Sequence, residues 1–166
     1  MSEQLKCTYF FGGGEADGDR SMGKLLGGKG SHLAEMSRLR LPVPAGFTIT
    51  TDVCRFFLDN QRRFPVTMAQ EVQDSIVRVE HVMRRKFGDP ENPLLFSVRS
   101  GAPVSMPGMM ETVLNIGITP TTLSGLLKAS GGNERFVYET YARLIMMYAD
   151  VVMEKAEGIE PAEGEA

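Results

Sequence analysis

The sequence predicts a mixed α/β (α+β) domain followed by the start of a helical subdomain. Short β-prone runs alternate with amphipathic helical segments up to about residue 118, and only helical patterns follow. The 166 residues suffice for one domain with a hydrophobic core. We therefore expect an α/β subdomain over residues 1–118, an incomplete helical subdomain over 119–155 and an acidic, disordered tail over 156–166.

The first elements alternate between strand and helix. The run CTYFF at 7–11 predicts a strand that three glycines end. The sequence GGKG at 27–30 predicts a glycine loop that opens a helix. A second strand is expected over 47–50, and Thr51 is expected to cap a helix over 52–60.

The clearest helical pattern covers residues 67–88. Its apolar positions recur at helical spacing and form one stripe: Met68, Val72, Ile76, Val79 and Met83. We expect Thr67 to cap the start of this helix. The basic RRK run before Gly88 is expected to end it, since cations suit the C-terminal end of the helix dipole. The apolar run at 94–98 then predicts a buried strand.

The last part of the sequence is helical. A short capped helix and a glycine turn are expected over 119–136, and a longer helix over 134–156. One face of the longer helix is apolar: Val137, Tyr141, Leu144, Tyr148 and Val152. We expect this face to be exposed, because it would pack on further sequence in a longer chain. An exposed face of this kind favours self-association.

Composition argues against several classes of protein. The net charge of -3 argues against a nucleic-acid binder that relies on positive charge. No apolar run approaches transmembrane length, and the first residues lack the apolar core of a signal peptide. Cys7 and Cys54 lack metal-ligand spacing. A reducing compartment is the simpler interpretation, although two cysteines also permit a disulfide.

Lys29 is the first candidate for phosphate binding. Glycines before a helix expose amide donors at its positive end, and Lys29 adds a mobile full charge. The spacing is not that of a Walker loop. The alternative is a glycine turn with a solvated lysine, which composition alone favours.

Arg99 is the second candidate. It stands at the end of the predicted buried strand and opens a stretch rich in glycine and methionine, residues 99–117. A guanidinium can donate two parallel hydrogen bonds to phosphate, and Pro107-Gly108 would let backbone amides approach the same anion. The alternative makes Arg99 a structural ion-pair partner and the methionines core filler. The residues alone do not separate these interpretations.

Together these stretches resemble the N-terminal nucleotide-binding domain of the pyruvate, phosphate dikinase family. The similarity runs from about Tyr9 to Val152, and five segments follow the family pattern in order: FFGGGEADGD, LLGGKGSHLAEM, LPVPAGFTITTDVC, KFGDPENPLLFSVRSGA and SMPGMMETVLNIG. Related phosphoenolpyruvate synthases and glucan, water dikinases share the K-G and V-R-S elements, whereas SMPGMM points to the dikinase.

The resemblance implies an ATP-grasp domain that binds ATP with Mg²⁺. Family enzymes interconvert ATP, phosphate and pyruvate with AMP, diphosphate and phosphoenolpyruvate. Lys29 matches the lysine that contacts the ATP phosphates, and Arg99 matches the phosphate-binding arginine. Gly108 and Met110 match the loop whose backbone closes over the terminal phosphates. ATP and the remainder of such an enzyme are the expected partners. The cytoplasm is the expected compartment, with glycosome and plastid as alternatives.

The sequence departs from the family in two respects. Pro103 stands where the family usually has a basic residue, and proline supplies neither charge nor an amide donor. Family enzymes are also several times longer, and the resemblance puts their magnesium ligands, adenine-binding segment, phosphohistidine and pyruvate site beyond this sequence. His32 and His81 lie outside the phosphohistidine motif, so we expect ordinary helix histidines. We expect an ATP-binding portion without turnover alone. The alternatives are a non-catalytic remnant and a partner-dependent phosphate-binding module.

Overall fold

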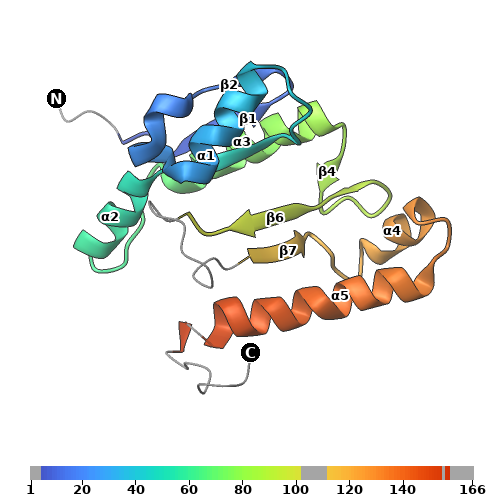
Figure 1. The fold of residues 1–166 in the computed structure, drawn as a ribbon. Helices are drawn as coiled ribbons and strands as arrows, with labels where there is room; N and C mark the ends of the chain where they lie inside the picture. The colour runs from blue at the N-terminus through green and yellow to red at the C-terminus, as the bar shows by residue number, and fades with distance from the viewer. Residues whose placement is uncertain (1–4, 102–111, 155, 158–166) are drawn as a thin grey trace. The chain divides into compact units, whose positions relative to one another are not determined.

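The fold is mixed α/β, as the sequence predicts (Figure 1). The computed structural model describes residues 5–101, 112–154 and 156–157. These residues pack into two compact units, one with 5–84 and 101, the other with 85–100, 112–154 and 156–157. The predicted subdomain boundary at residue 118 differs from this division and stays a prediction. Most of the predicted tail lies outside the described residues.

The first unit is built on a three-stranded antiparallel sheet with the order β2-β1-β3. Its strands are β1 (Thr8–Gly12), β2 (Glu15–Ala16) and β3 (Gly46–Ile49). The register pairs Phe11 with Ala16 and Phe10 with Phe47. The two predicted strands are confirmed. The short β2 was not predicted, because two residues are too few to show an alternating pattern.

Two long helices cover this sheet: α1 (Gly23–Arg38) and α3 (Met68–Met83). The hydroxyl of Ser75 in α3 donates to the Thr8 hydroxyl across 3.0 Å. Tyr9 lies on the other side of β1, where it and Leu26 of α1 both flank Gly18. Successive strand residues point to opposite faces. The two helices therefore cover opposite faces of β1.

Helix α2 (Thr51–Asp59) begins one residue earlier than the sequence predicts. Thr50, not Thr51, occupies the N-cap position, and it makes no side-chain cap bond. The Thr51 hydroxyl instead donates to the Lys24 carbonyl across 2.8 Å. The predicted capping role of Thr51 is therefore wrong, because its hydroxyl is engaged by α1.

Helix α3 begins directly after Thr67, as predicted, but Thr67 makes no side-chain cap bond and the predicted end of the helix is wrong. The helix stops at Met83, and Arg84 takes a left-handed conformation with φ 53°. The RRK run therefore lies beyond the helix, because Lys86 and Phe87 already pair with the next strand. In the predicted stripe, Val79 is fully buried and Met83 is 37% exposed.

The second unit holds two small sheets. Strands β4 (Lys86–Phe87) and β5 (Pro93–Leu94) are parallel, and β6 (Phe96–Arg99) and β7 (Thr112–Ile116) are antiparallel. The β6–β7 register shifts by one residue near Asn115, whose φ of 61° is typical of a β-bulge.

The predicted burial of the strand at 94–98 is only partly right. Leu94 is buried, but Val98 is 55% exposed. The reason is that helix α5 packs on β7, the partner of β6. The prediction assumed a strand covered on both faces.

Helices α4 (Leu123–Ala129) and α5 (Glu134–Tyr148) complete the second unit, and a π-helical turn over Ala149–Glu154 follows. The Asn133 side chain caps α5 by accepting from the Phe136 amide across 3.0 Å. Leu144 of α5 joins Val113 and Ile118 in the core of this unit. Among the described residues, none forms a helix long and apolar enough to cross a membrane.

The expected exposure of the apolar α5 face is wrong for two of its residues. Val137 and Leu144 are only 2% and 8% exposed, because α5 packs on β7 and α4 within the same unit. Tyr148 is 47% exposed. Self-association through the C-terminal helices stays a prediction.

Candidate functional site

The glycine-rich turn of α1 is the local structure that positions Lys29. Gly27 has φ 69° and ψ 169°, so it joins two helical segments across a kink. A positive φ of this kind favours glycine. The second segment therefore starts at Gly28 and Lys29. The first turn of a helix in general has N–H groups without intrahelical partners, at the positive end of the dipole. The predicted helix opening is confirmed, although helical residues also precede the kink.

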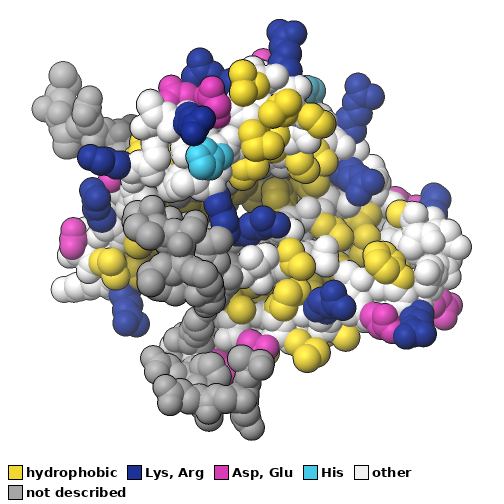
Figure 2. All heavy atoms as spheres, in the orientation of Figure 1, with side chains coloured by type: hydrophobic (Ala, Val, Ile, Leu, Met, Phe, Trp, Pro, Cys, Tyr) yellow, Lys and Arg dark blue, Asp and Glu magenta, His cyan; other side chains and the backbone are white. Residues whose placement is uncertain are grey.

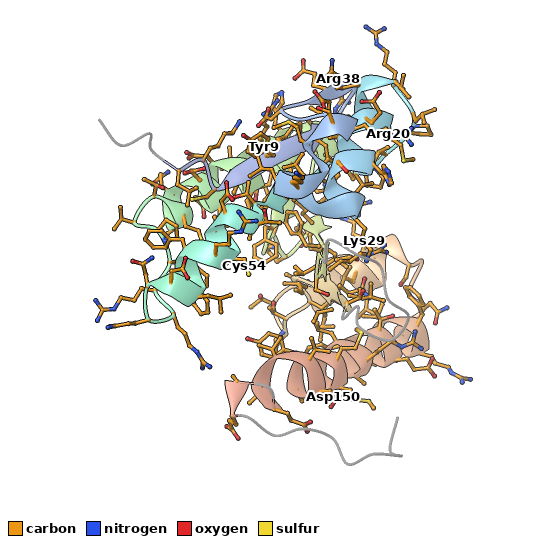
Figure 3. The ribbon with its side chains drawn as sticks, turned by 60° about the vertical axis from the view of Figure 1, so that its left-hand side comes forward. Tyr9, Arg20, Lys29, Arg38, Cys54 and Asp150 are labelled. Atoms are coloured by element: carbon orange, nitrogen blue, oxygen red, sulfur yellow. The ribbon has the colours of Figure 1, made fainter. Side chains whose placement is uncertain are left out.

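Lys29 itself is half-buried on α1 (Figure 3). Within the described ranges, its ammonium group has no ion pair or hydrogen bond partner. An unpaired cation beside a glycine turn is able to bind an anion. The same geometry also suits a solvated lysine, so the phosphate-binding role of Lys29 stays a prediction.

Two contacts beneath the turn were not predicted from the sequence. The Ser31 hydroxyl, in a residue only 2% exposed, donates to the carbonyls of Gly27 and Gly28 at 2.9 and 3.1 Å. A Cβ atom on Gly30 would lie 2.7 Å from the Thr48 hydroxyl on β3. The glycines of GGKG predict a close approach of the backbone, but they do not indicate which strand the turn approaches.

Arg99 is the last residue of β6, opposite Thr112, and it is exposed. It forms no ion pair with any residue that the structure describes, so the interpretation of Arg99 as a structural ion-pair partner gains no support there. Gly108, Met110 and Pro103 lie outside the described residues. Lys29 belongs to the first unit and Arg99 to the second, so their shared contact with one polyphosphate stays a prediction.

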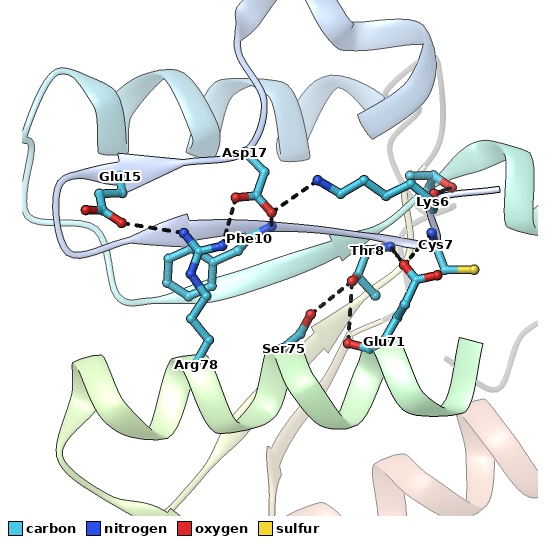
Figure 4. Close-up of polar contacts among 10 residues, drawn as sticks. Lys6, Cys7, Thr8, Phe10, Glu15, Asp17, Glu71, Ser75 and Arg78 are labelled. Atoms are coloured by element: carbon cyan, nitrogen blue, oxygen red, sulfur yellow. Dashed lines mark hydrogen bonds and ion pairs between the residues drawn. The ribbon is translucent and has the colours of Figure 1, made fainter. Parts of the chain in front are cut away.

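A polar cluster between β1 and α3 was missed from the sequence (Figure 4). The Asp17 carboxylate accepts from the Phe10 amide at 3.1 Å, from Arg78 at 2.8 Å and from Lys6 at 3.4 Å. The Arg78 guanidinium also lies 3.8 Å from the centre of the Phe10 ring. Sequence patterns could not reveal the cluster, because Asp17 and Arg78 lie 61 residues apart.

Glu71 belongs to the same cluster. Its carboxylate accepts from the amides of Cys7 and Thr8 at 2.7 and 3.2 Å. Burial raises the pKa of Glu71 and of Asp17, but the hydrogen bonds from these amides, and from Arg78 to Asp17, outweigh burial and leave both pKa values lowered. Because both carboxylates are satisfied internally, we interpret the cluster as a link between β1 and α3 and not as a ligand site.

Comparison with known proteins places the Gly27 turn within a segment that matches a known protein family. Residues 23–64 match the family model described as "Pyruvate phosphate dikinase, AMP/ATP-binding domain", and this range contains the Gly27 turn, Lys29 and β3. Over 148 residues, 89% of the chain, the sequence is 47% identical to the pyruvate, phosphate dikinase of Rhizobium meliloti (strain 1021). The chain belongs to the pyruvate, phosphate dikinase family. The chain covers 16% of the length of that relative.

Other dikinases give a consistent result. The chain is 46% identical to the chloroplastic pyruvate, phosphate dikinase 1 of Zea mays over 149 residues, 90% of the chain and 16% of that enzyme. It is 47% identical to the pyruvate, phosphate dikinase of Clostridium symbiosum over 138 residues, 83% of the chain and 16% of that enzyme. The chain therefore spans 16% of the length of each of these dikinases.

The two histidines of the chain lie at the surface. His32 and His81 are exposed on α1 and α3. Lys and Arg side chains are distributed over the visible surface, with acidic side chains among them (Figure 2). Both cysteines are free, Cys7 buried and Cys54 exposed. In the described part of the chain, no three His, Cys, Asp or Glu side chains gather as a metal site would require.

Proposed function

We propose that the chain is the ATP-binding portion of a pyruvate, phosphate dikinase-like phosphotransferase with an ATP-grasp fold. The observation that carries this proposal is the match of residues 23–64 to an AMP/ATP-binding domain. This range contains the Gly27 turn and Lys29, which has no ion pair among the described residues. Identity of 47% to a dikinase over 89% of the chain supports it. We place the protein in the cytoplasm, with glycosome and plastid as alternatives.

In this proposal Lys29 and Arg99 each donate charge-assisted hydrogen bonds to phosphate oxygens. The backbone amides of Gly28 and Lys29 lie at the positive end of a helix dipole, which stabilises the negative charge of the same phosphate. Gly108 and Met110 contribute the loop that closes over the terminal phosphates. These roles follow from the positions that match the family motifs, together with the unpaired state of the two cations among the described residues.

Mg²⁺ accompanies ATP in the proposed function, but the described residues do not fit a protein-held ion. No group of three potential ligands gathers among them. We therefore assign the chain no step that passes through the metal. When bound to ATP, Mg²⁺ neutralises phosphate charge.

A binding titration tests the proposal. MgATP and inorganic triphosphate would be titrated into the full chain and into its Lys29→Ala and Arg99→Ala variants, with amide shifts followed by NMR. Loss of one charge-assisted bond costs about 1.5–3 kcal/mol, or roughly ten- to a hundredfold in affinity. Arg135→Ala is a matched control, because it removes an equal charge from an exposed residue of α5. Equal affinity in all four proteins would refute the proposed function.

A further inference from the structure

The turn that carries Lys29 is held by one buried hydroxyl, that of Ser31. Ser31 lies on α1, is 2% exposed, and donates to the carbonyls of Gly27 and Gly28 at 2.9 and 3.1 Å. A serine hydroxyl has one proton, so the two carbonyls share it. Both peptide planes that lead to Lys29, 27–28 and 28–29, are thus tied to the same side chain.

The contact of Ser31 with the two carbonyls also affects the backbone N–H groups of the next residues, Gly28 and Lys29. The peptide group is planar and trans, so its C=O and N–H point in opposite directions. When Ser31 holds the carbonyls of Gly27 and Gly28, it also fixes the direction of the N–H groups of Gly28 and Lys29. These two amides belong to the first turn after the kink at Gly27. The hydroxyl therefore orients the donors that the proposed function assigns to phosphate.

A second contact fixes the turn against the sheet. Gly30 is buried, and a Cβ atom there would lie 2.7 Å from the Thr48 hydroxyl oxygen and 2.9 Å from its methyl carbon. Thr48 belongs to β3 and pairs with Tyr9 of β1. The backbone of the turn thus rests directly on the sheet, with no room for a side chain.

We propose that Ser31 and the Gly30–Thr48 contact are positioning elements for phosphate binding at the Gly27–Lys29 turn. This inference rests on the proposed function. The side chains of Ser31 and Thr48 need not touch the ligand, because each acts through the backbone that carries Lys29. A preorganised turn binds an anion more tightly than one that must be ordered during binding.

The test compares two buried serines of the same helix. Ser37 is 1% exposed, donates to the Glu15 carbonyl at 2.7 Å and accepts from the Gly12 amide at 2.9 Å. Ser31→Ala and Ser37→Ala thus each remove a buried hydroxyl with two bonds. We expect Ser31→Ala to weaken binding of inorganic triphosphate about two- to tenfold and to speed hydrogen exchange at Gly28 and Lys29. Ser37→Ala should leave both measurements unchanged.

A size exchange tests the second contact. Gly30→Ala should weaken triphosphate binding, because the new methyl group must displace the turn from β3. Thr48→Ala removes the two nearest atoms, so the Gly30→Ala/Thr48→Ala double variant should recover affinity relative to Gly30→Ala. This double variant keeps the test available if Gly30→Ala alone does not fold.

The outcomes separate this inference from the proposed function. If the unmodified chain does not bind triphosphate at all, both fail. If it binds and Lys29→Ala weakens binding, while Ser31→Ala and Ser37→Ala bind equally well, the proposed function stands and the positioning role of Ser31 is refuted. Loss of affinity in Ser31→Ala alone, together with faster exchange at Gly28 and Lys29, supports the inference.

Discussion

The Arg78 guanidinium donates to the Asp17 carboxylate across 2.8 Å and at the same time covers the Phe10 ring at 3.8 Å. Its side chain is 41% exposed, and that of Asp17 is 24% exposed. The Arg78 side chain of α3 thus contacts the Phe10 ring of β1 and also Asp17, the carboxylate that accepts from the Phe10 amide. Among the described strands of the first unit, β1 is the one with two strand partners, and this contact links it to the helix on one of its faces.

Arg78→Ala is expected to lower the free energy of unfolding by about 1–2 kcal/mol, because it removes a cation–π contact and a partly exposed ion pair. Urea denaturation of the full chain measures this change. Arg135→Ala serves as the control, since its pair with Glu139 at 2.7 Å lies on an exposed helix surface. There the loss should be about 0.3–0.5 kcal/mol. Equal losses would show that the contact with Phe10 contributes nothing.

Replacement of Glu71 should lower the free energy of unfolding more than replacement of Arg78 does. Its carboxylate accepts from two backbone amides at the start of β1, Cys7 and Thr8, and both residues are buried. Glu71→Ala leaves these amides without an acceptor, which costs about 1–3 kcal/mol. Glu71→Gln keeps one acceptor oxygen and should cost less. The same denaturation experiment ranks the two variants, and a larger loss in Glu71→Gln would contradict the role of the carboxylate as an acceptor.

Acid should destabilise the chain through these same carboxylates. Hydrogen bonds hold the pKa of Asp17 below 3.8 and that of Glu71 below 4.5, although burial opposes both shifts. A lowered native pKa gives stability that is fully present above the unfolded-state value and is lost as the pH falls through the native value. The urea midpoint should therefore be nearly constant above about pH 5.5 and fall below about pH 4.5.

The Asp17→Asn/Glu71→Gln double variant checks which groups cause this loss. It should be less stable at pH 7 and lose less of its remaining stability between pH 5 and pH 3. Some dependence should persist, because the pKa values of Asp19 and Asp89 are also lowered by hydrogen bonds, from Ser21 and from the Asn92 and Glu91 amides. An unchanged slope in the double variant would assign the acid effect to other groups.

The two cysteines should differ in reactivity. Burial, together with the neighbouring Glu71 carboxylate, raises the pKa of the Cys7 thiol, and Cys7 is 0% exposed. A raised pKa and burial both reduce the reactive thiolate. Cys54 is exposed on α2. A thiol reagent at pH 8 should modify one cysteine in the folded chain and two in urea. Rapid modification of both in the folded chain would contradict the buried position of Cys7.

Local sequence patterns predicted those elements whose structure depends on local interactions. The strands at Thr8–Gly12 and Gly46–Ile49 and the start of α3 follow from short β-prone runs and from helical spacing. The end of α3 did not follow, because Arg84 leaves the helix and the next residues, Lys86 and Phe87, pair with β5. Packing of one element on another overrode the preference of a basic run for a helix end.

The candidate site shows the same limit. The GGKG sequence predicted the turn at Gly27 and the position of Lys29 within it. The hydrogen bonds from the Ser31 hydroxyl form only because the helix is kinked at Gly27. The Gly30–Thr48 contact forms only because α1 packs on β3, and Thr48 lies 18 residues after Gly30 in the chain. Neither of these appears in a local pattern. The relation between Lys29 and Arg99 depends on two separate units, so it stays a prediction.

The purified 166-residue chain is expected to bind ATP without forming phosphoenolpyruvate from pyruvate, phosphate and ATP. The family resemblance places the phosphohistidine and the pyruvate site outside the matched segment, which covers 16% of each dikinase compared above. His32 and His81 lie on exposed surfaces of α1 and α3, outside the phosphohistidine motif, so neither is expected to replace that group. Incubation of the chain with all three substrates should therefore yield no AMP and no phosphoenolpyruvate above the level of a heated sample, while the full-length Rhizobium meliloti enzyme serves as the positive control. Product that depends on the chain and disappears in Lys29→Ala would overturn this expectation and would assign the chain a catalytic role of its own.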